Sequence, residues 1–419
     1  MNKRLPVHMS FFDTRPSQTG GILLEENDWI TQLKEKRLSY GISQNRLAVT
    51  AGISREYLSK IESGRKEPTE EVKTSLMEAL ERLNPDNPLE MMFDYVRIRF
   101  PTQDVRHVIQ DILHLKMEYM LHEDYGFYSY SEHYAYGDIF ILTSPEEEKG
   151  TLLELKGKGC RQFENFLLAQ HRSWFDFLMD ALVDGGVMKR LDLAINDMAG
   201  ILDIPELTEK CRREECVSVF RSFKSYRSGE LVKSHEEDKL GMGSTLYIGS
   251  LKSEVYFCLY EKNYEQYVKY GIPIEETPIK NRFEIRLKNE RAYYAVKDLL
   301  THYDAEQTAF SIINRYVRFV DKEVEKRRSE WRMNEKWAHF LGDGRGRLKL
   351  TTKPEPYTLQ RTLNWIARQV APTWKTIQKI DAANKSTYLL DILEHAKLTE
   401  KHRTIIKQQT ASVEEVITT

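Results

Sequence analysis

Three segments of the chain alternate apolar and polar residues, at residues 189–196, 254–262 and 282–288. A period of two is typical of strands that bury one face and expose the other. Side chains at every second position then share a face of the sheet. The polar faces of these segments carry one candidate functional group each: Asp192, Tyr260 and Glu284.

The residues around these segments predict an α+β domain. Further strands are expected at residues 92–100, 125–142 and 151–156 and near Tyr247, and helices at 105–120, 160–183 and 204–221. Because the strands are mainly adjacent along the chain, a mainly antiparallel sheet is the expected arrangement. From about residue 292 to the end, the pattern is nearly all helical and highly charged.

The N-terminal part has the pattern of a small all-α DNA-binding domain. Ser43 is expected to cap one helix, Gly52 to provide a tight turn, and Ser54 to cap the next helix. This pattern resembles the helix-turn-helix of the Cro/C1-repressor type, whose second helix lies in a major groove. The candidate DNA-binding residues are Gln44, Ser54, Arg55, Glu56, Tyr57, Ser59 and Lys60. A generic helical bundle is the alternative.

The pattern divides the 419 residues into four parts. We expect a flexible segment at residues 1–27, the helix-turn-helix domain at 28–86, a catalytic α+β domain at 87–320 and a charged helical region at 321–419. Turn-forming residues at positions 84–88 mark the linker between the first two domains.

The composition indicates a cellular compartment for the protein but does not identify a binding partner. The 62 basic and 64 acidic residues nearly cancel, and a neutral total does not exclude a local basic face for nucleic acid. No apolar run is long enough to cross a membrane or to serve as a signal peptide. The four cysteines have no zinc-binding spacing, which favours free thiols and a cytoplasmic protein.

Carboxylates and a tyrosine on one sheet suit metal-assisted cleavage of a phosphodiester. That reaction needs a cation to balance charge on the phosphate and a nucleophile in line with the leaving 3′ oxygen. The candidate ligands for Mg²⁺ or Mn²⁺ are Glu154, Asp192 and Glu284. Tyr260 is the candidate nucleophile, and Lys262, expected on the same strand face, would favour its ionisation. The candidate phosphate-binding cations are Arg190, Arg282 and Arg286.

Periodicity alone leaves a plainer interpretation open. Isolated carboxylates on strands are usually solvated or paired with cations, and the chain has 22 tyrosines. Other tyrosines close to Tyr260 could act in its place: Tyr256, Tyr264, Tyr267 and Tyr270.

Four motifs in order resemble the Rep_trans family, over about residues 90–320. They are Arg-Leu-Asp at 190–192, Tyr-Ile-Gly-Ser at 247–250, Leu-Tyr-Glu-Lys at 259–262 and Arg-Phe-Glu-Ile-Arg-Leu at 282–287. The family comprises rolling-circle plasmid replication initiators and the MobT relaxases of integrative and conjugative elements. The two-histidine motif of other relaxases is absent, since no His-x-His pair occurs. A helix-turn-helix ahead of the core makes the chain most similar to the MobT relaxases.

This resemblance implies a DNA relaxase that nicks a transfer origin in one strand and keeps a covalent 5′-phosphotyrosine link. It assigns the nucleophile to Tyr260 and acidic ligands of a divalent metal ion to Asp192 and Glu284, with Glu154 as a further ligand. It also implies duplex and single-stranded origin DNA as partners, together with accessory transfer proteins, a coupling protein and a helicase. Glu261 departs from the Asn of many plasmid initiators.

Two other functions stay open at this point. One is a plasmid replication initiator with the same chemistry. The other is a non-catalytic transcription regulator, whose large C-terminal part would sense a ligand or form oligomers. A regulator would bind DNA without cutting it.

Overall fold

The computed structural model describes residues 21–40, 42–84, 88–229, 241–343, 348 and 350–418. The chain divides into two compact units, Met1–Asp86 and Asn87–Thr419. No helix in this described part of the chain is both long enough and apolar enough to span a membrane.

The N-terminal unit is helical, as predicted. Its helices are α1 (Gly21–Ser39), α2 (Gln44–Thr50), α3 (Arg55–Glu62) and α4 (Glu70–Arg82). They enclose a core that includes Leu47, Leu58 and Ile61. Gly52 has a φ of +70°, which gives the turn between α2 and α3. Helix α1 begins within the segment predicted to be flexible, and residues 1–20 lie outside the described residues.

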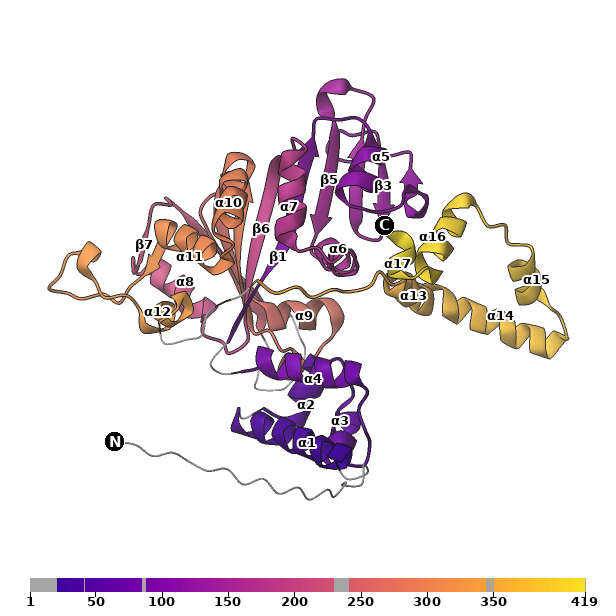
Figure 1. Cartoon of the computed structure of the whole chain (residues 1–419), viewed down its shortest axis with the longest axis horizontal. Coiled ribbons are helices and arrows are strands. Elements are labelled where there is room, and N and C mark those ends of the chain that lie inside the picture. Colours follow the sequence, from indigo (N-terminus) through magenta and orange to yellow (C-terminus); the bar gives the residue numbers. More distant parts are fainter. Residues whose placement is uncertain are drawn as a thin grey trace, which may run out of the picture. The chain divides into compact units, whose positions relative to one another are not determined.

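An antiparallel sheet dominates the second unit (Figure 1). Within the described residues it has ten strands, in the order β2-β3-β4-β5-β1-β6-β11-β10-β9-β8. They are β1 (Leu89–Phe100), β2 (Leu121–Glu123), β3 (Glu132–Tyr136), β4 (Ile139–Thr143), β5 (Thr151–Lys156), β6 (Val187–Asp197), β8 (Phe223–Gly229), β9 (Gly241–Ile248), β10 (Val255–Glu261) and β11 (Asn281–Lys288). Strands β7 (Cys216–Ser218) and β12 (Val317–Phe319) form a separate pair. The predicted α+β class with a mainly antiparallel sheet is confirmed.

Helices cover one face of the large sheet. They include α6 (Lys158–Ala169), α7 (Trp174–Val183), α10 (Asn289–His302) and α11 (Ala305–Tyr316). Their apolar side chains, such as Phe163, Phe177 and Val296, pack against Leu193 and Phe283 of the sheet in one core. The alternation of the central strands therefore leaves their polar side chains on the opposite face.

Several predicted elements are shorter than expected. The helix predicted at 160–183 is broken into α6 and α7, because Ser173 starts α7 with a capping box to Asp176. The helix predicted at 105–120 consists of α5 (Val105–His107) and the π-helix η1 (Val108–Ile112).

Two other predictions merged neighbouring elements. The region at 204–221 holds α8 (Ile204–Arg212) and then β7. The strand predicted at 125–142 is the hairpin β3–β4. These breaks follow from turns and caps, which hydrophobic periodicity does not register.

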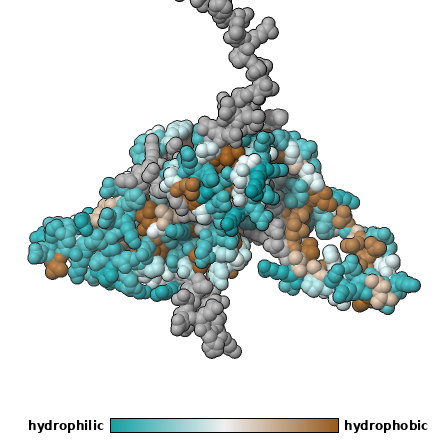
Figure 2. All heavy atoms as spheres, turned by 90° about the horizontal axis from the view of Figure 1, so that it is seen from below, coloured by the Kyte–Doolittle hydropathy of each residue, from teal (hydrophilic) through white to brown (hydrophobic). Residues whose placement is uncertain are grey.

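The C-terminal region is largely helical. Its helices are α12 (Glu335–Leu341), α13 (Gln360–Trp365), α14 (Ala371–Asn384), α15 (Tyr388–Glu394), α16 (Glu400–Thr410) and α17 (Val413–Val416), with the π-helix η6 (Ile366–Val370) after α13. The end of the chain returns to the sheet domain, where Val416 is buried and its carbonyl accepts a hydrogen bond from the Lys116 backbone. In the helices α13 to α15, Trp365 and Leu390 are exposed. Apolar surface is visible on this part of the chain in Figure 2.

Candidate active site

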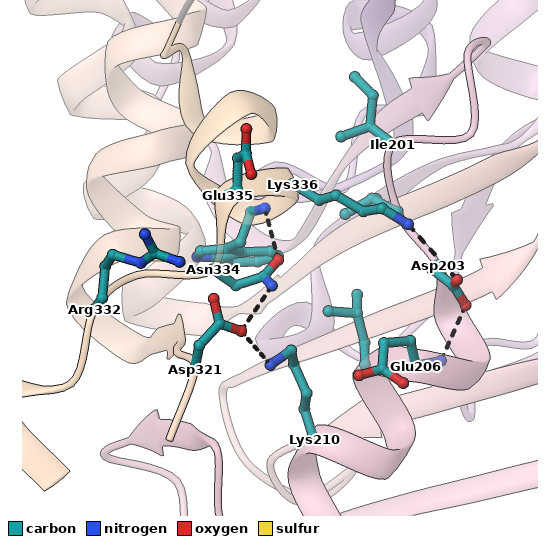
Figure 3. Close-up of a pocket in the computed structure, with 12 residues that line it drawn as sticks. Ile201, Asp203, Glu206, Lys210, Asp321, Arg332, Asn334, Glu335 and Lys336 are labelled. Carbon is teal, nitrogen blue, oxygen red and sulfur yellow. Dashed lines mark hydrogen bonds and ion pairs between the residues drawn. The ribbon is translucent and has the colours of Figure 1, made fainter. Parts of the chain in front are cut away.

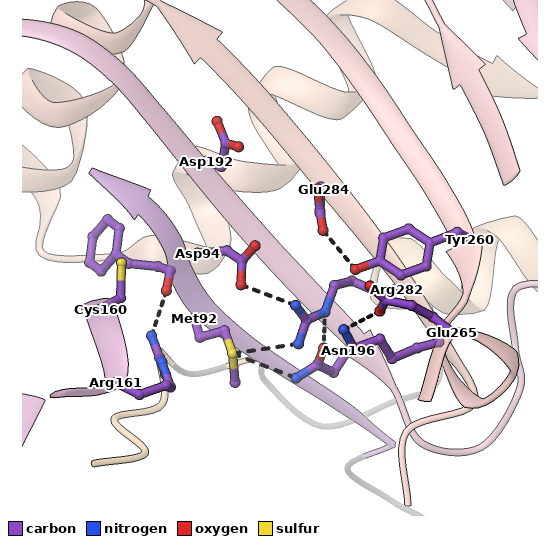
Figure 4. Close-up of polar contacts among 12 residues, drawn as sticks. Met92, Asp94, Cys160, Arg161, Asp192, Asn196, Tyr260, Glu265, Arg282 and Glu284 are labelled. Atoms are coloured by element: carbon purple, nitrogen blue, oxygen red, sulfur yellow. Dashed lines mark hydrogen bonds and ion pairs between the residues drawn. The ribbon is translucent and has the colours of Figure 1, made fainter. Parts of the chain in front are cut away.

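The polar face of the central strands gathers the predicted catalytic groups (Figure 4). Strands β5, β1, β6, β11 and β10 are consecutive in the sheet. Together they form the floor of a groove of about 1090 Å³. The predicted residues that line it are Glu154, Arg190, Asp192, Tyr260, Lys262, Arg282, Glu284 and Arg286. The α9 helix (Lys262–Tyr270) also lines the groove, next to the end of β10.

Tyr260 lies near the end of β10 and points at a carboxylate. Its hydroxyl donates a hydrogen bond of 2.9 Å to Oε1 of Glu284 on the neighbouring strand β11. Burial, and then the charge of Glu284, raise the pKa of Tyr260 well above its ordinary value. The phenol is therefore protonated at neutral pH, and its hydrogen-bond acceptor is positioned to take the proton.

Asp192 and Glu284 form a buried acidic pair on adjacent strands. Their exposed fractions are 2% and 3%. Arg190 forms hydrogen bonds of 2.9 and 2.6 Å to the two oxygens of Asp192, and Arg286 forms two to Oε2 of Glu284. Arg286 also lies 3.8 Å from Asp192. Burial raises the pKa of Asp192 to about 6, and the charge of Glu284 acts in the same direction.

These two carboxylates fit the chemistry of a hard divalent cation. Both supply oxygen atoms as ligands. A positive charge between them would offset the cost of burying their negative charges and the repulsion between the two carboxylates, which together raise the pKa of Asp192. A cation would compete with Arg190 and Arg286 for the same oxygens. Within the described residues, no group of three or more His, Cys, Asp or Glu side chains is placed to hold a metal ion.

Glu154 does not join this pair in the structure. It lies two strands from Asp192 in the sheet order and accepts hydrogen bonds from the hydroxyls of Tyr95 and Tyr128, the latter at 2.9 Å. The sequence interpretation missed Tyr95. A β-bulge between Phe93 and Tyr95 shifts the register of β1 against β6, and one-residue bulges leave no mark in a hydrophobic pattern.

The position predicted for Lys262 is wrong. Strand β10 ends at Glu261, so Lys262 is the first residue of α9 and not a strand residue. Its ammonium nevertheless lies 5.5 Å from the ring centre of Tyr260 and forms an ion pair with Glu265. Burial, and then the charge of Arg282, lower the pKa of Lys262.

Arg282, predicted as a phosphate contact, is paired within the protein. It is buried, and it donates hydrogen bonds of 2.7 Å to Asn196 and 3.0 Å to Asp94. The backbone of Arg282 is the register partner of Tyr260. Arg282 therefore links neighbouring strands next to Tyr260, and it lines the groove together with Arg190 and Arg286, whose side chains are less buried.

The alternative tyrosines are less well placed than Tyr260. Tyr256 is on the same face of β10 but is buried beneath cations, with Lys288 5.1 Å from its ring centre. The other three lie on α9, where Tyr270 is 60% exposed. Among these tyrosines, the hydrogen bond to a carboxylate of the acidic pair belongs to Tyr260.

The helix-turn-helix residues separate into two groups. Arg55, Glu56, Ser59 and Lys60 are exposed on α3, as predicted, and Ser54 caps that helix by accepting a hydrogen bond from Tyr57 N.

The remaining two candidates are occupied within the unit. Tyr57 packs partly against the core. The Gln44 amide donates a hydrogen bond of 2.8 Å to Glu62, which also forms a buried ion pair of 2.6 Å with Arg37. Gln44 therefore fixes α2 to α3 in this structure, a role that the sequence pattern did not distinguish from DNA contact.

A second, smaller cavity of about 240 Å³ lies between α8 and α12 (Figure 3). Some of its charged groups pair with one another: Lys210 pairs with Asp321 at 2.7 Å, and Asn334 donates to the same carboxylate at 2.9 Å. This network joins α8 to the segment before α12.

The fold and the site together define a tyrosine-bearing, mainly antiparallel α+β domain with an acidic pair, preceded by a helix-turn-helix. Three family profiles match consecutive parts of the chain. They are "Helix-turn-helix" at residues 33–85, "Rolling Circle replication initiation protein N-terminal domain" at 90–180 and "Replication initiation factor" at 186–393.

The chain is also similar to individual proteins with related descriptions. "Putative DNA relaxase NicK" of Bacillus subtilis (strain 168) is 41% identical over 333 residues, which span 79% of this chain and 93% of that protein. The solved rolling circle replication initiator protein from Geobacillus stearothermophilus shares the fold, with a TM-score of 0.54 and 24% identity, covering 63% of this chain and 99% of the other. The chain belongs to the Rep_trans family of replication initiation factors and carries an N-terminal helix-turn-helix domain. The predicted family is confirmed.

Proposed function

We propose that the protein is a site- and strand-specific DNA relaxase that nicks an origin by attack of Tyr260 on a phosphodiester. The observation that carries this proposal is the hydrogen bond from Tyr260 to Glu284 inside the polar groove. Membership of a family of replication initiation factors and the similarity to a protein named as a DNA relaxase support nicking. The helix-turn-helix favours a start of conjugative transfer, and rolling-circle replication of a plasmid is the alternative.

The residues of the site divide the reaction between them. The proton of Tyr260 passes to Glu284 as the phenolic oxygen bonds to phosphorus and the bond from phosphorus to the 3′ oxygen breaks. The 3′ oxygen takes a proton from solvent, and the 5′ phosphate stays on Tyr260. Lys262 lies close enough to stabilise negative charge on the phenol, while Arg190 and Arg286 neutralise the phosphate.

We propose Asp192 and Glu284 as the ligands of a divalent cation, Mg²⁺ or Mn²⁺. When bound, such a cation would neutralise the charge that develops on the phosphate. Glu154 would complete the ligand set only after leaving the hydroxyls of Tyr95 and Tyr128.

Nicking of a supercoiled plasmid that carries the origin tests the proposed activity. With Mg²⁺ or Mn²⁺ we expect open circles with protein covalently attached, and no nicking in excess chelator. A plasmid without the origin is the control. Full nicking in chelator would rule out the metal. Retarded but uncut plasmid in every metal would instead support a transcription regulator.

The helix-turn-helix is proposed to read duplex DNA beside the nick site. We expect Arg55→Ala with Lys60→Ala to weaken origin binding, because both side chains are exposed on α3. A lost bidentate base contact would cost about 1–3 kcal/mol at the specific site, whereas a lost phosphate contact would weaken binding to all DNA alike. Fluorescence anisotropy with origin and scrambled duplexes measures both effects. The charge-matched control is Lys297→Ala with Lys322→Ala, exposed residues of the second unit.

Deletion of residues 1–86 tests the same division of labour. Because the two units are compact separately, the remainder should still cleave a single-stranded oligonucleotide that bears the nick site. Complete loss of this cleavage in a demonstrably folded truncated protein would make the helix-turn-helix part of the catalytic machinery.

A further inference from the structure

The groove has a second cationic end, where β5 meets α6. Helix α6 begins at Lys158, directly after the exposed end of β5 at Lys156, and no side chain caps it at Gly157. The first backbone N–H groups of a helix have no partners within the helix, and they carry partial positive charge. Gly157 and Lys158 both line the groove that contains Tyr260.

The two glycines of this turn have different roles. A Cβ on Gly159 would lie 2.2 Å from the carbonyl oxygen of Asp138, so Gly159 is required for close packing against the β3–β4 turn. Gly157 has a φ of +49°, and a Cβ there would meet no atom of the described residues within 4 Å. The space above Gly157 is therefore open to a ligand. The carboxylate of Asp138, beside the turn, accepts a hydrogen bond from Gln162.

Arg161 provides an independent sign of a ligand. The residue is only 7% exposed and lines the same groove. Its Nη2 donates to the Phe93 carbonyl and pairs with Glu164 at 2.9 Å. Its Nη1 is buried, and no described residue offers it a hydrogen-bond partner. Buried guanidinium donors are normally paired, so this atom calls for an acceptor from outside the described part of the chain.

We propose that the start of α6, with Lys158 and Arg161, binds a backbone phosphate of the DNA strand whose scissile phosphate lies at Tyr260. The inference rests on the proposed function and extends it to a second contact on the same strand. Strands β5 and β10 are four positions apart in the sheet, which at about 4.8 Å per position is roughly 19 Å. The contact would therefore fall several nucleotides from the nick and would hold the strand across the acidic pair.

A DNA strand fits this end better than a free nucleotide. One continuous groove of about 1090 Å³ connects it to Tyr260, so a chain of phosphates can reach both ends. The Gly157-Lys158-Gly159 turn also lacks the Gly-Lys-Ser/Thr sequence of a nucleotide-binding P-loop.

Phosphate scanning tests this second contact without relying on cleavage. Full-length Tyr260→Phe protein, which cannot attach covalently, is titrated with single-stranded oligonucleotides that carry one neutral methylphosphonate each, at successive positions. We expect about a fivefold or larger loss of affinity at one position several nucleotides from the nick. Adding Lys158→Ala and Arg161→Lys should remove this positional loss and lower the salt-dependence slope by about 0.7 per lost phosphate contact.

The variants separate the contact from folding and from general charge. Arg161→Lys keeps a cation beside Glu164, and Lys158→Ala alone changes only an exposed side chain and should already reduce the loss. Lys297→Ala with Lys322→Arg, which also removes one positive charge in total from exposed positions, is the charge-matched control and should keep the full profile. An unchanged methylphosphonate profile in the Lys158 and Arg161 variants would overturn the proposal, whether or not the wild type nicks DNA. Saturable ATP binding that the same variants lose would assign the site to a free nucleotide instead.

Discussion

Tyr260→Phe is expected to abolish nicking and covalent attachment while origin binding stays within about twofold of wild type. The substitution removes only the hydroxyl, and the ring can keep its contact with the ammonium of Lys262. Glu284 loses one hydrogen-bond donor but keeps Arg286 as a partner. Leaving one lone pair of a buried acceptor unsatisfied costs about 1–3 kcal/mol, so the folded protein should melt at a slightly lower temperature. Plasmid nicking, denaturing gels for the covalent adduct and anisotropy measure the three properties.

Tyr264→Phe is the matched control for this variant. It removes the same atom from a neighbouring tyrosine on α9, which has no hydrogen bond to the acidic pair. Normal nicking is expected from this control. If Tyr260→Phe also nicked normally, Tyr260 could not be the nucleophile.

Glu284→Gln is expected to give the second large loss of nicking, of at least about a hundredfold, because positioned proton transfer contributes roughly 10²–10⁴-fold. The amide keeps the size of the side chain but carries no charge and is a poor base. It also leaves Arg286 without one of its carboxylate partners. Asp192→Asn should likewise suppress nicking, since Asp192 is the other member of the acidic pair.

Metal binding distinguishes the two roles proposed for the acidic pair. Calorimetry with Mn²⁺ should show weaker binding in both variants. Glu276→Gln, an exposed substitution at the end of the 3₁₀ helix η4 (Ile274–Glu276), should bind and nick normally. Unchanged Mn²⁺ affinity with lost nicking in Glu284→Gln would leave Glu284 as a base and remove it from the ligand set. Unimpaired nicking in both variants would contradict the proposed site.

The alternation of polar and apolar residues was sufficient to predict the centre of the sheet. Because a period of two assigns each side chain to a face, Asp192, Tyr260 and Glu284 could be placed together before their strands were seen to be neighbours. Their adjacency also required pairing between distant strands, and the family resemblance supplied that order. The end of β10 was predicted one residue too late, since nothing in the pattern marks Lys262 as the start of a helix.

Contacts that depend on three-dimensional packing could not be predicted in this way. The bulge in β1 brings Tyr95 to Glu154, and the cross-strand hydrogen bonds of Arg282 bury a side chain that periodicity alone would leave exposed. The unpaired donor of Arg161 could not be predicted either, because a buried side-chain atom can be recognised as unpaired only when the residues around it are known. A predicted helix was similarly too long where a capping residue such as Ser173 begins a new helix.

Mass mapping of the peptide–oligonucleotide adduct tests the central claim most directly. The wild-type protein is incubated with a single-stranded origin oligonucleotide and Mn²⁺, then digested, and the peptide that carries the 5′ phosphate is sequenced by mass spectrometry. We predict that the modified residue is Tyr260. An adduct on Tyr256, Tyr264, Tyr267 or Tyr270, or efficient cleavage with no protein adduct at all, would contradict the account.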